Sequence, residues 1–207
     1  MNSPSIKNII FDIGNVLVRW SPIEIIRLTF GEMDNDKDLA KALLQSDLWL
    51  TYNRGEFSES EAKRQFQTQF KLSEDIVEVL FYYIKQTQIP IYGMYDLVKR
   101  VKLAGYNTYA LTDNVLEIVD HLKAKYDFWD LFLGAIVSAE VKFLKPSAQI
   151  FNCLLDTYQL KADECIFIDD VLANVEGAKT LGFNTILFKN AAQCERELHL
   201  LGITTTV

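Results

Sequence analysis

Short apolar runs alternate with helical patterns along most of the chain. Five runs have the length and composition of buried strands, and they cover residues 6–11, 106–111, 134–137, 165–168 and 184–188. Because helical patterns separate the last four runs, the order predicts a parallel sheet wrapped by helices. We therefore expect a doubly wound, Rossmann-like α/β fold.

Three apolar stripes at helical spacing predict helices that pack on this sheet. The stripes are Met94, Leu97, Val98 and Val101; Ile150, Phe151, Leu154, Leu155 and Tyr158; and Val175, Ala178 and Leu181. Gly105 and Gly182 lie where the first and third helices should end, and Pro146 lies near the start of the second. The stripe residues are predicted to be core positions and not ligands.

The segment after the first run differs, because about 70 residues follow that predict helices only. Within it, Ser58 and Glu61 have the spacing of a capping box ahead of a helical stripe. An all-helical insertion after the first strand of an α/β sheet has the outline of a cap. We expect a cap over residues 18–90 and an α/β core built from residues 1–17 and 91–207.

Composition places the 207-residue chain among globular proteins, with 49% apolar and 24% charged residues. The net charge of −7 opposes non-specific binding to nucleic acid. No run approaches the roughly 18 consecutive apolar residues that a membrane span requires. We therefore expect neither nucleic acid nor a membrane as a partner.

The three cysteines lack CxxC spacing, and the chain has two histidines. This pattern does not fit a zinc site, and an odd number of thiols suits a reducing compartment. The first residues also lack the charged-then-apolar pattern of a secretory signal. We expect a cytoplasmic protein, a monomer or weak homodimer, whose cysteines are packing residues.

Polar side chains follow several predicted strands, at the edge where open parallel sheets bind ligands. Asp12 follows the first run, Thr112 the second, and Asp169 and Asp170 the fourth, while Lys145 lies just before a predicted helix. Taken singly, each has an ordinary structural explanation, because Asp and Thr often form turns or caps and Lys is usually solvated. Together they predict three carboxylates, one hydroxyl and one ammonium on one rim.

The adjacent carboxylates of Asp169 and Asp170 are the most specific feature of this rim. Two carboxylates at the end of a buried strand repel each other unless a proton or a cation intervenes. Mg²⁺ is a hard cation that prefers oxygen ligands, and it removes this conflict. The pair therefore indicates a magnesium site.

Four short motifs follow one another along the chain. They are Phe-Asp-Ile-Gly-Asn-Val at 11–16, Leu-Thr at 111–112, Lys-Pro at 145–146, and Phe-Ile-Asp-Asp at 167–170 with Asn174 and Gly-Ala at 177–178. In this order they resemble the motifs of the haloacid dehalogenase-like superfamily. Segments 20–22 and 53–56 resemble the subgroup with a helical cap after the first motif, which includes bacterial sugar-phosphate phosphatases.

The resemblance implies a magnesium-dependent phosphatase that acts on small phosphorylated metabolites through an aspartyl-phosphate at Asp12. The implied catalytic residues are Asp12, Thr112 and Lys145. The implied metal ligands are Asp12, Gly14 through its carbonyl, Asp169 and Asp170, and Asp170 is favoured over Asp169 as the direct ligand. The implied phosphate-binding residues are Asn15, Thr112, Asp113, Asn114 and Lys145, to which we add Arg19 and Arg54 as cap residues that approach the rim.

Two positions depart from the pattern of the superfamily. Most of its phosphatases carry an Asp two residues after the nucleophile, which protonates the leaving oxygen, and here that residue is Gly14. Because general acid–base catalysis typically contributes ~10²–10⁴-fold, we expect slow turnover of sugar phosphates and faster turnover of aryl or acyl phosphates. Asp113 replaces a common Asn, and we expect its carboxylate to point away from phosphate.

Two other functions are compatible with the same fold. A metal-free 2-haloacid dehalogenase also uses an Asp nucleophile, but that chemistry gains nothing from the acid pair. A catalytically weak or inactive relative that binds a phosphorylated ligand or a protein would explain Gly14 and Asp113. It would leave the retention of Asp12, Lys145 and the acid pair unexplained.

Overall fold

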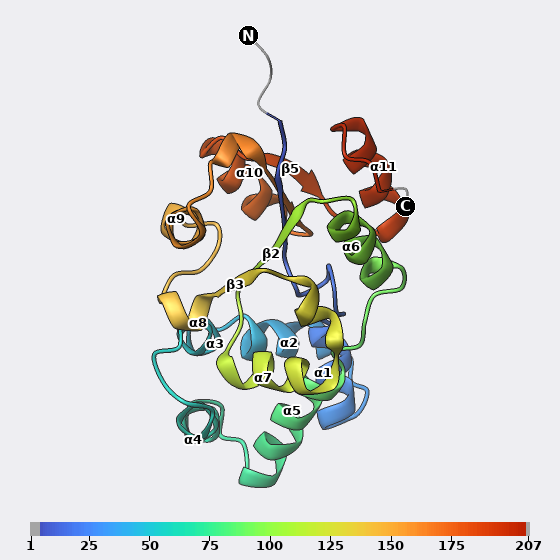
Figure 1. The fold of residues 1–207 in the computed structure, drawn as a ribbon. Helices are drawn as coiled ribbons and strands as arrows, with labels where there is room; N and C mark the ends of the chain where they lie inside the picture. Colours follow the sequence, from blue (N-terminus) through green and yellow to red (C-terminus); the bar gives the residue numbers. More distant parts are fainter. Residues whose placement is uncertain (1–4, 206–207) are drawn as a thin grey trace.

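A single parallel sheet forms the centre of the molecule (Figure 1). The computed structural model describes residues 5–205. The strands are β1 (Asn8–Phe11), β2 (Asn107–Thr112), β3 (Gly134–Val137), β4 (Cys165–Asp169) and β5 (Asn184–Leu187). Their order is β3-β2-β1-β4-β5, and all neighbouring pairs are parallel. The doubly wound α/β fold is confirmed, and each predicted strand is present with its ends shifted by at most two residues.

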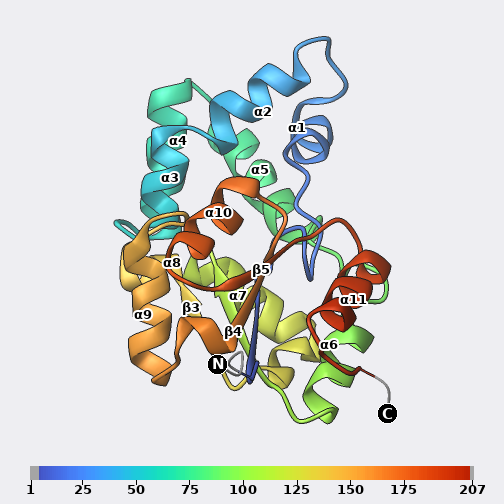
Figure 2. The same ribbon diagram turned by 90° about the horizontal axis from the view of Figure 1, so that it is seen from above.

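Helices cover both faces of the sheet (Figure 2). One face packs against α6 (Met94–Leu103), α7 (Leu116–Lys125) and α11 (Ala191–Leu200). The opposite face packs against α9 (Ala148–Tyr158) and α10 (Leu172–Thr180). The elements α8 (Ser138–Val141), η1 (Asp127–Leu131) and η2 (Ala162–Glu164) are short connections. The strands are buried on both sides, as their continuous apolar runs predict.

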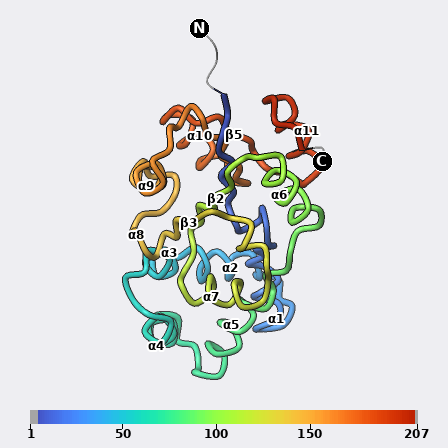
Figure 3. Tube along the Cα trace, viewed as in Figure 1, coloured from blue at the N-terminus to red at the C-terminus, as the bar shows by residue number. Residues whose placement is uncertain are grey.

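Five further helices lie beyond one end of the sheet, and the chain enters them from β1 and leaves them to α6 (Figure 3). They are α1 (Pro22–Phe30), α2 (Asp36–Leu44), α3 (Asp47–Asn53), α4 (Glu59–Phe70) and α5 (Glu74–Gln86). We interpret these helices as the cap and keep the proposed division at residues 18–90. Residues 1–4 and 206–207 of the proposed core lie outside the described part of the chain.

Serine side chains begin three of the cap helices. Ser58 accepts a hydrogen bond from the Glu61 amide at 3.4 Å, as the spacing predicts. The reciprocal half of the capping box is replaced, because the Glu61 carboxylate pairs with Arg64 on the next turn. Ser46 and Ser73 cap α3 and α5 in the same way.

The cap and the core meet at the turn after α3. The buried Ser138 hydroxyl at the start of α8 donates to the Asn53 carbonyl at 2.6 Å and accepts from the Asn114 amide at 2.8 Å. Gly55 has φ +65°, and a Cβ there would lie 2.3 Å from the Ala139 carbonyl oxygen. Only glycine allows this turn and α8 to approach each other so closely.

A second contact joins the cap to α7. The Glu117 carboxylate accepts hydrogen bonds from the Tyr52 hydroxyl at 3.3 Å and the Glu59 amide at 3.0 Å. Burial, followed by the charges of Glu117 and Glu59, raises the pKa of Tyr52, so the hydroxyl stays protonated and remains a donor.

No helix in the described part of the chain is long and apolar enough to cross a bilayer.

Candidate active site

The register of the sheet brings the predicted rim residues to one edge. Phe11 of β1 is paired with Ala110 of β2 and with Ile168 of β4. Asp12, the next residue, therefore lies beside Asp169, and its amide donates to the Ile168 carbonyl at 2.9 Å. The carboxyl ends of the three central strands thus position the polar groups together.

Lys145 is the centre of a buried charge network. Its ammonium contacts Asp12 Oδ1 at 2.8 Å, Asp169 Oδ2 at 2.7 Å and the Leu111 carbonyl at 3.2 Å. An ammonium has three N–H donors, so these contacts use all of them. Burial alone would lower the pKa of Lys145, but the carboxylates of Asp12, Asp169 and Asp113 outweigh it and raise the pKa. The side chain is therefore a fixed cation that orients Asp12.

The two acids of the pair have different surroundings. Asp169 is fully buried, and it accepts hydrogen bonds from the Val171 amide at 2.8 Å and from the Asn174 amide at 3.1 Å on both oxygens. Asp170 is half-buried and accepts from Asn15 at 3.1 Å through Oδ2. The lone pairs of Asp169 are largely used, whereas Asp170 retains an oxygen for a ligand.

The acid cluster carries more negative charge than its own cation balances. Ligand atoms of Asp12, Asp169 and Asp170 lie within 4.8 Å of one another, with Lys145 as the cation in contact. Burial raises the pKa of Asp12, opposed by the attraction of Lys145, and burial likewise raises the pKa of Asp170. A hard divalent cation fits this set of oxygen donors and would offset the repulsion.

Asp12 presents one oxygen to the protein. Its Oδ1 contacts Lys145 and also accepts from the Ile13 amide at 2.7 Å. Both contacts fix the carboxylate plane, and Oδ2 carries no hydrogen bond from the described residues. The free oxygen is the one available to attack an electrophile or to bind a cation.

A cavity of about 250 Å³ opens over this network. We call its two sides the core wall, with Asp12, Asp113, Lys145 and Asp170, and the cap wall, with Trp20, Leu44, Trp49 and Leu50. Gly14, Asn15 and Asn114 also line the cavity. Thr112 and Asp169 are buried and are not among the described residues that line it.

The two cap arginines are not brought to this cavity in the described structure. Arg19 pairs with Glu24 at 2.6 Å. Arg54 pairs with Glu56 at 2.7 Å and donates to the Thr51 hydroxyl at 2.9 Å. Each arginine finds a partner a few residues away on its own segment, which the sequence spacing alone did not reveal.

Asp113 and Gly14 are the two positions that depart from the superfamily pattern, and the structure shows what surrounds each of them. The Asp113 carboxylate accepts from the Lys145 amide at 3.0 Å, so it is turned to the protein backbone. Burial raises the pKa of Asp113, while Lys145 opposes this shift. A Cβ on Gly14 would meet Trp20 at 3.9 Å, an ordinary contact, so packing does not require glycine here.

Asn174 and Ser138 have roles that sequence reasoning did not assign. Asn174 lies in the first turn of α10, so its position shortly after the acid pair could have indicated that it turns back to Asp169. Ser138 follows β3 and bridges the Asn53 carbonyl to the Asn114 amide. No local signal marks Ser138, because its partners are distant in sequence.

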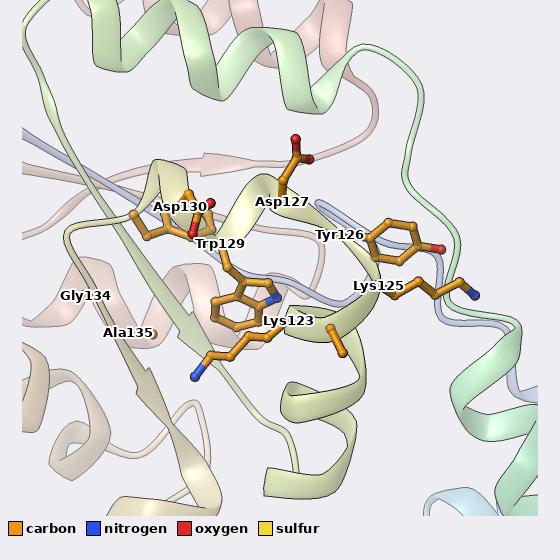
Figure 4. A pocket seen from close by; sticks show the side chains of 10 residues that line it. Lys123, Lys125, Tyr126, Asp127, Trp129, Asp130, Gly134 and Ala135 are labelled. Atoms are coloured by element: carbon orange, nitrogen blue, oxygen red, sulfur yellow. The ribbon is translucent and has the colours of Figure 1, made fainter.

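A larger hollow of about 730 Å³ lies at the other end of β3 (Figure 4). Trp129 lies within it, and the ammonium of Lys123 is 5.4 Å from the Trp129 ring centroid. Asp127 and Asp130 come from η1 at its border. The hollow contains none of the residues of the acid cluster, so it is separate from the candidate active site.

Comparison with known proteins agrees with the geometry of the site. A family model described as haloacid dehalogenase-like hydrolase matches residues 6–182. A sesquiterpene phosphatase of Aspergillus oryzae is 28% identical over 95% of this chain and 97% of its own. A D-ribitol-5-phosphate phosphatase of Bacteroides thetaiotaomicron is 26% identical over 95% of this chain and 98% of its own.

Other similar proteins are longer or more distant. The chain spans 36% of the length of a drimenol cyclase of Aspergillus calidoustus. A Bacteroides thetaiotaomicron protein of known structure, crystallised with magnesium and inorganic phosphate, superposes with a TM-score of 0.71. It is 21% identical and covers 90% of this chain and 96% of its own, so this likeness concerns the fold.

Proposed function

The chain belongs to the haloacid dehalogenase-like hydrolases, and we propose that it hydrolyses phosphate monoesters of small metabolites with the help of Mg²⁺. One observation carries the proposal: Asp12, clamped by Lys145 through Oδ1, lies within reach of the acid pair at the carboxyl edge of the sheet. Relatives named as phosphatases, matched along nearly their whole length, support the same chemistry.

In the proposed reaction, a carboxylate oxygen of Asp12 attacks phosphorus, the P–O ester bond breaks, and the ester oxygen leaves with that electron pair and takes its proton from water. A second water then attacks the phosphorus of the aspartyl-phosphate and gives up a proton to solvent, the acyl P–O bond breaks, and inorganic phosphate and the Asp12 carboxylate are formed. Lys145 holds Asp12 in one orientation and favours its anionic form. Asn15 and Asn114 line the cavity and provide amide groups near the phosphate position.

Asp12, Asp170 and the carbonyl of Gly14 would hold the ion, and Asp169 would support the cluster from below. When bound, Mg²⁺ supplies positive charge that offsets repulsion between the nucleophile and the phosphate dianion. We assign Asp170 as the direct ligand because Asn174, the Val171 amide and Lys145 already occupy Asp169.

At position 14, where the superfamily pattern has an Asp that protonates the leaving oxygen, this chain has glycine. Esters whose leaving group is stable as an anion need no such proton, whereas alkoxide leaving groups do. We therefore propose that aryl and acyl phosphates react faster than alkyl phosphates.

The experiment measures phosphate release from 4-nitrophenyl phosphate and from alkyl phosphates with Mg²⁺ and with EDTA. We expect Mg²⁺-dependent release, faster for the aryl ester, and a loss of about 10⁴-fold or more in Asp12→Asn. Asp156→Asn, an exposed position on α9, is the matched control and should retain activity. Activity that survives Asp12→Asn, or halide release from 2-haloacids in EDTA without phosphatase activity, would contradict the proposal.

A further inference from the structure

The charges that line the cavity are distributed unevenly. Among residues 5–205, the charged lining residues Asp12, Asp113, Lys145 and Asp170 all come from the core. The cap wall contributes no charge, since Arg19 and Arg54 are paired elsewhere. The end of a ligand that faces the cap therefore meets no ionic partner in this part of the chain.

Aromatic and aliphatic surface dominates the cap wall. Trp20 and Trp49 stack with ring centroids 5.7 Å apart and an interplanar angle of 10°. Leu44 and Leu50 extend the same surface, and Ile118 of α7 lines the cavity as well. Two stacked indoles form a rigid apolar plate, which binds an apolar group at low entropic cost.

Three polar side chains line the cap side of the cavity; Gln45 is exposed, whereas Asn53 and Gln88 are partly engaged. The Asn53 amide donates to the Trp49 carbonyl at 2.8 Å, and the Gln88 amide donates to the Ile84 carbonyl at 3.0 Å. Both residues line the cavity but keep only their side-chain oxygens free. Those oxygens lie at the margin of the plate, so hydroxyl groups of a polyol that faced the stacked rings themselves would find no partner there, which disfavours binding.

We propose that, among alkyl phosphates, the preferred substrate is a monoester of a small apolar alcohol, with its hydrocarbon part against the Trp20–Trp49 plate. The inference rests on the proposed phosphatase function and assigns its substrate class. The volume of about 250 Å³ suits a compact ligand, because pockets for drug-sized molecules typically have ~300–1,000 Å³.

The test compares n-pentyl phosphate with D-ribitol 5-phosphate, since both are primary esters with the same carbon chain and differ in the hydroxyl groups. We expect kcat/KM at least about tenfold higher for n-pentyl phosphate, because each buried methylene favours binding by about fourfold. Ribitol is the better leaving group of the two, so intrinsic reactivity works against this expectation.

A pair of variants locates the preference on the cap wall. Leu50 is 40% exposed and lines the cavity, so Leu50→Gln should fold and should lower the pentyl-to-ribitol ratio of kcat/KM by about fourfold or more. Leu28 is 45% exposed on α1 and is not among the described lining residues, so Leu28→Gln should leave the ratio unchanged.

The outcomes separate this inference from the function on which it rests. Phosphate release from 4-nitrophenyl phosphate with equal or faster turnover of ribitol 5-phosphate would overturn the substrate class and leave the phosphatase intact. An unchanged ratio in Leu50→Gln would also overturn the assignment to the cap wall. No Mg²⁺-dependent release from any ester would overturn the proposed function itself.

Discussion

On the core wall of the cavity, charged groups are held by other charged groups, whereas on the cap wall apolar rings pack against one another. The Lys145 ammonium contacts Asp12, Asp169 and the Leu111 carbonyl, so the positions of the charged side chains on the core wall are fixed. The indole rings of Trp20 and Trp49, in contrast, are held together by stacking. Under the proposed function, this difference assigns the chemistry to the core and the selection of the alcohol to the cap.

If this division is correct, the largest effects come from the core wall. Lys145→Met should lower kcat for every ester by about 10²–10³-fold, because Asp12 loses its fixed cation. It should also destabilise the fold by about 3–5 kcal/mol, since buried carboxylates lose their partner. Thermal unfolding and steady-state kinetics measure the two effects.

Two comparisons make the Lys145→Met experiment specific. Lys179→Met replaces an exposed lysine whose contact to Glu176 is 3.8 Å, so it should change stability by less than about 0.5 kcal/mol. Added Mg²⁺ should recover part of the stability of Lys145→Met, because it binds the same carboxylates. Full activity in Lys145→Met would show that the core wall does not depend on this cation.

An intermediate effect is expected where the two regions touch. Gly55→Ala should weaken docking of the cap, because its Cβ would lie 2.3 Å from the Ala139 carbonyl oxygen. Holding an alanine in left-handed backbone lowers the free energy of unfolding by about 1–2 kcal/mol, and the contact with α8 lowers it further. Urea unfolding and KM for n-pentyl phosphate are the measurements.

Gly105→Ala is the matched control for this contact. Gly105 also has positive φ, at +93°, but a Cβ there would meet nothing within 4 Å. Gly105→Ala should therefore show the backbone cost without a change in KM. Equal effects of the two substitutions on stability and on KM would mean that the cap does not rely on the Gly55 contact.

The smallest effect concerns the electrostatic contact between α7 and the cap. The pKa of His121 is lowered, mainly by burial and further by the positive charges of Lys125 in the core and Lys85 in the cap. The unfolded chain, with a histidine pKa of about 6.5, then binds the proton more readily, so His121 reduces stability as the pH falls through that value.

The variant His121→Gln isolates this contribution. Between pH 7.5 and pH 5.5 its midpoint of urea unfolding should fall by less than that of the wild type, because the other titrating groups are common to both. Lys85→Gln, which removes the cap charge, should shift the pH dependence in the same direction. A steeper decline in His121→Gln would contradict the sign.

The strands, the helices that wrap them and the acidic edge could be predicted from the sequence, because apolar periodicity reports burial directly. The parallel register then places Asp12 beside Asp169 without further information. The partners of long polar side chains were harder to predict from the sequence. Arg19 pairs with Glu24 and Arg54 pairs with Glu56, and apolar periodicity carries no information on such pairs.

Contacts between regions distant in sequence were the least predictable part. Ser138 joins the cap to the core only because α3 and α8 are brought together by the whole fold. The same holds for the cap wall, since the stacking of Trp20 on Trp49 depends on how two separate segments pack. A pattern along one segment contains no information on such partners.

The surroundings of Gly14 bear on how this enzyme could diversify. A Cβ at this position would meet Trp20 at 3.9 Å, an ordinary contact, so the backbone accepts a side chain there without a clash at Cβ. Packing at Cβ therefore does not fix glycine at the position where the superfamily resemblance places a proton donor. A lineage could therefore acquire or lose this donor by one replacement and keep the same fold.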